Sequence, residues 1–97
     1  MADYILSGKA DEDLAGIYRF SYERFGEAQA DAYLTALEEC FMALAKNPAL
    51  GRSADIIRKN YFRYEHISHS IFYTRKNASA IMIMRVLHNS MDAPRHV

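Results

Sequence analysis

The 97-residue chain has no tryptophan, one cysteine, two prolines and four widely spaced glycines. The single cysteine, Cys40, cannot form a disulfide within the chain, which fits a reducing compartment, and we expect it to be a buried apolar side chain. The glycines are too far apart for a phosphate-binding loop, and no apolar run approaches the roughly 18 residues of a membrane span. We therefore expect a cytoplasmic protein with no cofactor and no membrane association.

Net charge is also absent, because twelve basic residues balance twelve acidic ones. The balance is uneven along the chain: residues 1–50 carry nine acidic and four basic side chains, whereas residues 51–97 carry three acidic and eight basic ones. A basic half can face nucleic acid or an acidic protein segment, or it can be a solvated surface that balances the acidic half. A net charge of zero argues against non-specific DNA binding as the main activity.

The first half of the chain has a clear helical pattern. Tyr4-Ile5-Leu6 is a short apolar run that predicts an edge strand, and Ser7 offers an N-cap for a helix that runs to Phe25. Gly26 ends this helix, and a second helix is predicted from about Glu27 to Lys46. Because one glycine separates them, the two helices should form an antiparallel hairpin. We expect its core-facing side chains to be Leu14, Ile17, Leu37, Phe41 and Leu44.

The second half is rich in aromatic and β-branched residues, which is typical of strands. Strands are predicted at residues 61–66, 70–74 and 80–88, with a polar hairpin loop at residues 75–79. The order β-α-α-β-β-β predicts one α+β domain over residues 1–97, in which a helical hairpin packs on one face of a small, mainly antiparallel sheet. Residues 89–97 would form a C-terminal tail.

The last predicted strand is apolar on both of its faces. Alternation places Ile81, Ile83, Arg85 and Leu87 on one face and Met82, Met84, Val86 and His88 on the other. Two helices can cover one face of a small sheet, so the second face is left short of cover, and an exposed apolar face usually has a partner. Self-association and partial cover by the tail are the alternatives.

Metal-binding and catalytic patterns are weak. His66 and His69 face opposite sides of an extended chain, so a zinc pair would need a turn at Ile67-Ser68. Cleavage of RNA needs a base, an acid and cations around the phosphate, and the candidates are Arg63, Glu65, Tyr73, Arg85 and His88. Arg85 and His88 are also an odd number of residues apart. Each has a structural alternative, Arg85 as a partner for an acid on a helix and His88 as a polar residue at a strand end.

Short motifs in a fixed order resemble one known family. The motifs are Tyr4-Ile5-Leu6-Ser7, Phe25-Gly26, Asn47-Pro48, Gly51-Arg52, Ile71-Phe72-Tyr73, and finally Arg85-Val86-Leu87-His88 with Met91-Asp92. Each motif is weak alone, but the ordered set covers almost the whole chain and is similar to the ParE branch of the RelE/ParE superfamily of bacterial toxins. The βααβββ fold that this resemblance implies agrees with the pattern-based prediction.

The resemblance implies a toxin of a type II toxin–antitoxin pair that binds and inhibits DNA gyrase, with no catalysis, metal, cofactor or small-molecule substrate. It also implies neutralisation by a ParD-like ribbon-helix-helix antitoxin in a hetero-oligomer, with operator DNA bound only through the antitoxin. Toxicity in the family is associated with the C-terminal segment, which corresponds here to Arg85, His88, Met91 and Asp92. We place the antitoxin contacts at Tyr64, Phe72, Met82, Met84 and Val86.

Two other functions stay open at this point. A relative of the RelE branch would cut mRNA on the ribosome, which requires Arg63, Arg85 or His88 to converge in one cleft. A degenerate toxin would retain only antitoxin binding and operon repression. A neighbouring gene for a ribbon-helix-helix protein would support all three interpretations without separating them.

Overall fold

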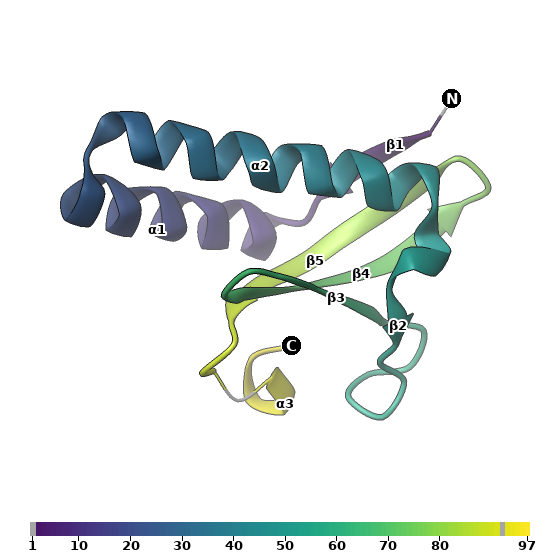
Figure 1. The fold of residues 1–97 in the computed structure, drawn as a ribbon. Coiled ribbons are helices and arrows are strands. Elements are labelled where there is room, and N and C mark those ends of the chain that lie inside the picture. The colour runs from purple at the N-terminus through teal and green to yellow at the C-terminus, as the bar shows by residue number, and fades with distance from the viewer. Residues whose placement is uncertain (1, 92) are drawn as a thin grey trace.

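The computed structural model describes residues 2–91 and 93–97, and its elements follow the predicted order (Figure 1). They are β1 (Asp3–Leu6), α1 (Gly8–Phe25), α2 (Glu27–Lys46), the 3-10 turn η1 (Pro48–Leu50), β2 (Arg52–Ser53), β3 (Phe62–His66), β4 (His69–Asn77), β5 (Ala80–His88) and α3 (Ala93–His96). The two long helices form a hairpin over one face of the sheet, while α3 lies on the other side. The α+β class is confirmed. In the described part of the chain, no helix has both the length and the apolar character of a membrane-spanning segment.

The sheet has five strands in the order β1-β5-β4-β3-β2, with β1 parallel to β5 and the other neighbours antiparallel. The predicted edge strand at Tyr4-Ile5-Leu6 is therefore confirmed as β1. The sequence does not predict β2, because two residues are too few to show an alternating pattern. The predicted hairpin loop at residues 75–79 is shorter in the structure, since β4 continues to Asn77 and the turn consists of Ala78 and Ser79. Residues 75–77 are polar because they are exposed at the end of β4.

Both ends of α1 form as the sequence predicts. Ser7 Oγ accepts a hydrogen bond from the amide of Ala10 at 3.0 Å and so caps the helix. Gly26 follows the last turn at φ 93°, a conformation that a residue with a Cβ rarely adopts. Ser7 Oγ also donates to the carbonyl oxygen of Met84 at 2.8 Å. The cap therefore connects the start of α1 to β5.

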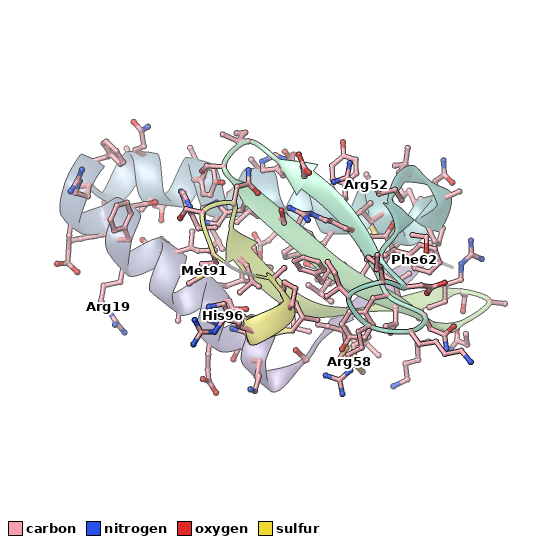
Figure 2. All side chains as sticks on the ribbon, turned by 90° about the horizontal axis from the view of Figure 1, so that it is seen from below. Arg19, Arg52, Arg58, Phe62, Met91 and His96 are labelled. Carbon is pink, nitrogen blue, oxygen red and sulfur yellow. The ribbon has the colours of Figure 1, made fainter. Side chains whose placement is uncertain are left out.

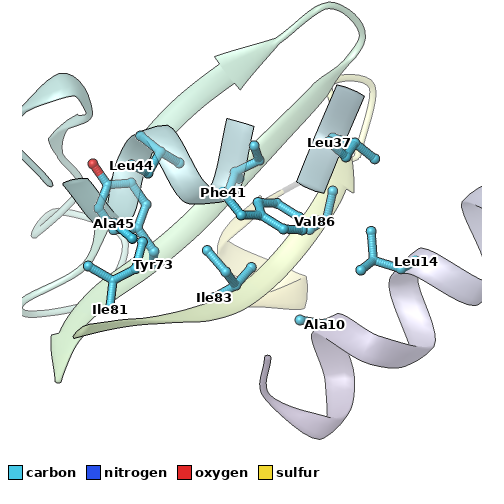
Figure 3. Packing of buried hydrophobic residues seen from close by; sticks show 11 residues of the cluster. Ala10, Leu14, Leu37, Phe41, Leu44, Ala45, Tyr73, Ile81, Ile83 and Val86 are labelled. Carbon is cyan, nitrogen blue, oxygen red and sulfur yellow. The ribbon is translucent and has the colours of Figure 1, made fainter. Parts of the chain in front are cut away.

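The main core lies between the helical hairpin and the sheet (Figure 3). The predicted core residues are confirmed there, with Leu14, Leu37, Phe41 and Leu44 buried and Ile17 packed at the margin. Their buried partners on the sheet are Ile71, Tyr73, Ile81, Ile83 and Val86. Cys40 also packs at the margin and is partly buried rather than fully buried, and this burial raises the pKa of its thiol.

The alternation predicted for β5 breaks at Met84. The register shifts between Phe72 and Tyr73, where a β-bulge leaves Met84 without a residue opposite it. One extra residue moves every later side chain to the other face, so Val86 lies in the helix-side core and Leu87 on the second face. The faces predicted for β5 beyond Met84 are therefore wrong.

The second face of the sheet is covered by segments of the same chain. A smaller cluster on this face consists of Ala54, Tyr61, Phe72 and Leu87, all buried. Ala54 and Tyr61 come from the segment after β2, and Ala93 and Val97 of the C-terminal segment pack against the same cluster. The expectation of a bare apolar face is wrong. Cover by the tail, which was the alternative, is confirmed, and the segment after β2 adds to it.

Gly51 leaves the space that Tyr73 occupies. Tyr73 is fully buried, and its hydroxyl donates to the carbonyl oxygen of Pro48 at 2.7 Å and accepts from the amide of Gly51 at 2.9 Å. A Cβ on Gly51 would overlap this hydroxyl and lie 2.8 Å from Cζ of the ring. We expect Gly51→Ala to lower the free energy of unfolding by about 1–3 kcal/mol, the usual cost of overpacking. Urea denaturation measures the change.

Gly16→Ala is the matched control for this prediction. Gly16 lies inside α1, and a Cβ at this position would meet no atom within 4 Å. Alanine is the better helix former, so this variant should be more stable than the wild type by about 0.5–1 kcal/mol. A Gly51→Ala protein as stable as the wild type would show that the Tyr73 ring can move at no cost.

Candidate functional site

Side chains from α1 complete the edge of β5 where β1 ends. β1 accompanies β5 as far as Ile83, which pairs with Leu6. Beyond that pair, Ser7 Oγ donates to the next carbonyl oxygen of β5 at 2.8 Å, and the amide of Val86 donates to Asp13 Oδ2 at 3.0 Å. Unpaired backbone groups at a sheet edge attract other strands. Ser7 and Asp13 therefore protect this edge and fix α1 against it.

Arg85 and Asp13 form a largely buried ion pair at the same edge. Arg85 Nε donates to Asp13 Oδ2 at 2.8 Å and Nη2 donates to Oδ1 at 2.9 Å, which is a bidentate geometry. The hydrogen bond with Asp13 is the main cause that raises the pKa of Arg85. Arg85 Nη1 donates to the carbonyl oxygen of His96 in α3. The prediction that Arg85 pairs with an acid on a helix is confirmed, and the pair also reaches the tail.

Three histidines and a tyrosine gather at the end of the sheet. A two-residue turn at Ile67-Ser68, with Ile67 at φ 54°, pairs His66 with His69, and His69 pairs with His88 of β5. Residues that are directly opposite share a face, and Tyr33 Oη of α2 lies 2.6 Å from His69 Nδ1. The turn needed to bring His66 and His69 together therefore exists. Even so, the residues that the structure describes form no group of three ligands that could hold a metal ion.

The surroundings of His69 make the stability of the fold depend on pH. Burial lowers the pKa of His69 from its ordinary value of 6.5, and the nearby His88 and His66 lower it further. The unfolded chain therefore binds this proton more readily than the folded one. The stability contributed by neutral His69 is complete above pH 6.5 and is lost as the pH falls through the folded pKa.

We expect the free energy of unfolding to fall on acidification from about pH 7.5 to about pH 5, and His69→Gln to make that fall smaller. The physical reason is that glutamine removes the group whose protonation the folded state resists. Urea denaturation of both proteins at several pH values measures the slopes. Equal slopes in the variant and the wild type would contradict the proposed environment of His69.

An apolar groove of about 710 Å³ runs between α1, the start of α2, the β3–β4 turn and the end of β5. Its exposed apolar side chains are Phe20, Phe25, Ile67 and Met91. Tyr33, His69 and His88 supply part of its polar lining. Exposed apolar patches of this kind, rimmed by polar groups, mark protein interaction sites. The groove can therefore take an apolar segment of another protein.

The chain has clear relatives among known proteins. Residues 4–93 match the sequence profile of the ParE toxin of the type II toxin–antitoxin system parDE. The chain belongs to the ParE toxin family. It is 37% identical to Toxin ParE1 of Mycobacterium tuberculosis over 94 residues, covering 97% of this chain and 96% of the relative. It is 35% identical to Toxin ParE1 of Caulobacter vibrioides over 97 residues, covering 100% of this chain and 99% of the relative.

A solved structure shares the fold. The chain matches one from the chromosomal ParDE toxin–antitoxin system of P. aeruginosa with a TM-score of 0.74, covering 91% of this chain and 96% of that one at 19% identity. Membership of the ParE family confirms the resemblance that the sequence motifs indicated. It makes the protein a toxin of a toxin–antitoxin system, and such a system includes an antitoxin partner.

In this ParE-family fold, the predicted target-binding residues fall into two groups. His88 and Met91 are exposed and line the groove. Arg85 is not part of that lining, and its guanidinium is engaged within the chain. Asp92 lies outside the described residues. Figure 2 shows Met91 on the segment that leads from β5 to α3.

The predicted antitoxin contacts do not form one continuous face. Phe72 and Val86 are almost fully buried, on opposite sides of the sheet. Tyr64, Met82 and Met84 are partly exposed, with Tyr64 packed against the helix-side core and Met84 against the smaller cluster. A partner that docks on the folded chain can reach these three side chains, and their contact with the antitoxin stays a prediction.

The candidate nuclease residues have partners within the chain. Arg63 Nη2 donates to Ser70 Oγ at 3.0 Å, and Glu65 pairs with Arg52 at 2.8 Å and with Arg63 Nε at 3.7 Å. Tyr73 is buried in the main core. Of the five candidates, His88 alone lines the groove.

Three residues take part in the site although the sequence gives them no such role. Asp13 has the signature of an ordinary acid in the early turns of a helix, and Tyr33 that of a core-facing residue. Phe20 is different, because the helical pattern of the sequence places it off the apolar stripe of α1. In the structure its side chain is 58% exposed. One exposed aromatic side chain is common on protein surfaces, and Phe20 becomes informative because Phe25, Ile67 and Met91 are exposed in the same groove.

Proposed function

We propose that this toxin inhibits DNA gyrase by protein–protein binding in the cytoplasm, without catalysing a reaction, and that a ParD-like antitoxin neutralises it. Family membership supports the toxin class, and the groove at the end of β5 is the observation that supports action by binding. Large apolar side chains surrounded by polar groups are typical of interface centres. The target would insert an apolar segment beside His88 and Met91.

The proposed target contacts are His88, Met91 and Asp92, and the groove joins the first two to Phe20 and Phe25 of α1. Phe20 and Phe25 come from α1, whereas His88 ends β5 and Met91 follows it, so the two groups are far apart in sequence. A partner that fills the groove would therefore contact both segments at once. Binding of this kind needs no metal ion, cofactor or small-molecule substrate.

The proposed antitoxin is a ribbon-helix-helix protein that forms a hetero-oligomer with the toxin. Its contacts would include the partly exposed Tyr64, Met82 and Met84. Operator DNA would be bound through the antitoxin, because the toxin has a formal net charge of zero and proteins that bind DNA non-specifically carry an excess of positive charge.

A plasmid supercoiling assay with purified gyrase, ATP and this protein tests the proposal. We expect a dose-dependent loss of supercoiling and an accumulation of linear DNA, and we expect added antitoxin to restore supercoiling. The protein must be shown to be folded in the same buffer. Normal supercoiling in the presence of folded protein would contradict the proposal, and ribosome-dependent cleavage of mRNA would then be the next activity to assay.

A further inference from the structure

Asp13 uses both of its carboxylate oxygens to hold β5. Oδ2 accepts from Arg85 Nε at 2.8 Å and from the amide of Val86 at 3.0 Å, and Oδ1 accepts from Arg85 Nη2 at 2.9 Å. The two charged side chains are only 15% and 16% exposed, so water competes weakly for these bonds. This contact links residues 72 positions apart and fixes α1 against the last strand.

Arg85 also binds the C-terminal tail. Two of its guanidinium nitrogens bind Asp13, and the third, Nη1, donates to the carbonyl oxygen of His96 in α3. All three nitrogens of the group are therefore engaged within the chain. Planar guanidinium groups bind in this way with fixed geometry, which a flexible ammonium cannot reproduce.

Two of the hydrogen bonds that hold the C-terminal segment lie on either side of Met91. At its start, the amide of Asn89 donates to the carbonyl oxygen of Ser68 at 2.8 Å. Near its end, Arg85 binds the carbonyl oxygen of His96. Met91 lies between these anchors, 46% exposed, and lines the groove. The amide of Met91 also donates to the carbonyl oxygen of His88 at 2.9 Å, and the bond from Arg85 to His96 adds the anchor on its C-terminal side.

We propose that Asp13 is a positioning residue that acts through Arg85 to hold the C-terminal segment so that Met91 lines the target-binding groove. Arg85 then connects α1 to α3 through its hydrogen bonds to both. The target contacts are made by His88 and Met91. The proposal rests on the proposed function, because it assigns a role in binding the target.

The test combines gyrase inhibition with hydrogen exchange in the wild type, Asp13→Ala, Arg85→Ala and the double variant. We expect each single substitution to raise the inhibitory concentration by about tenfold or more, which corresponds to the loss of a charge-assisted hydrogen bond. The double variant should be no weaker than Arg85→Ala, since the two residues act as one unit. The amides of Met91 and Val97 should exchange at least about tenfold faster in all three variants, and the amide of Val86 in the two variants that lack Asp13.

Asp11→Asn is the control, because Asp11 is an exposed acid on the same helix. It should leave inhibition and exchange at the tail unchanged. Asp13→Asn is a second variant for the case in which Asp13→Ala fails to fold, since asparagine keeps the shape of the side chain and removes its charge. It should show faster exchange at Met91 and Val97 with native circular dichroism.

Two results would overturn the proposal. One is normal exchange of the tail amides in Asp13→Asn, which would show that the pair does not position the segment. The other is loss of inhibition in Arg85→Ala with unchanged tail exchange, which would make Arg85 a direct target contact. If the wild type itself does not inhibit gyrase, the proposed function is wrong, and the exchange rates alone still decide whether Asp13 positions the tail.

Discussion

Removal of residues 91–97 is expected to weaken gyrase inhibition strongly and to leave the chain folded. The cut removes Met91, which is exposed in the groove, together with α3. It keeps Asn89, which accepts from Ser70 Oγ at 2.7 Å and whose amide donates to the carbonyl oxygen of Ser68 in the β3–β4 turn at 2.8 Å. A hot-spot side chain contributes about 2 kcal/mol or more to binding, so the inhibitory concentration should rise by at least about thirtyfold. The supercoiling assay measures it.

The stability of the shortened chain is the necessary companion measurement. Ala93 and Val97 leave the smaller cluster, so we expect a loss of roughly 1–3 kcal/mol in the free energy of unfolding. A cut after His88 is the matched comparison, and it should destabilise the chain further because it also removes Asn89. Inhibition at wild-type concentration by residues 1–90 would exclude the tail from target binding.

Phe41→Ala is expected to lower the free energy of unfolding more than either Gly51→Ala or the removal of residues 91–97. Phe41 is fully buried between the helical hairpin and the sheet, and its ring meets that of Tyr4 edge-on at a centroid distance of 5.4 Å. Removing a buried phenylalanine side chain leaves a cavity and costs about 3–5 kcal/mol. Urea denaturation at pH values well above the His69 transition measures the change.

Phe20→Ala is the matched control on the neighbouring helix. Phe20 is 58% exposed, so its removal should change stability by no more than about 0.5 kcal/mol. The melting temperature of Phe41→Ala should fall by more than about 10 °C, whereas that of Phe20→Ala should stay close to the wild type. A loss below about 1 kcal/mol for Phe41→Ala would contradict the packing described for the core.

The helical half of the fold could be predicted because its signals are local. Ser7 caps α1 with its own side chain, Gly26 ends the helix with a backbone angle that suits glycine, and Asn47-Pro48 follows the last turn of α2. Each signal acts within a few residues of the boundary that it sets. The core-facing residues followed from helical periodicity for the same reason.

The sheet and the site depended on contacts that no local pattern reveals. The bulge at Met84 arises from the pairing of β4 with β5 and reverses the faces of all later residues of β5. The cover of the second face comes from residues 54–61 and the tail, which show no periodic signal. The local sequence does not distinguish Asp13 from any other acidic residue near the start of a helix, because its partner Arg85 lies 72 residues away.

The pairing of β1 with β5 also sets the order of events when the chain is made. Asp3 pairs with Ala80 and Leu6 with Ile83, so the first strand cannot complete its pairing with another strand until the ribosome has synthesised residue 83. Pairings between residues so far apart form slowly, because a long stretch of chain must first be ordered. Until then the helical hairpin lacks the two sheet strands β1 and β5 as a pair, and the groove lacks the wall that β5 supplies. A chain that ends before residue 80 therefore lacks both the strand that joins β1 to β4 and one wall of the groove.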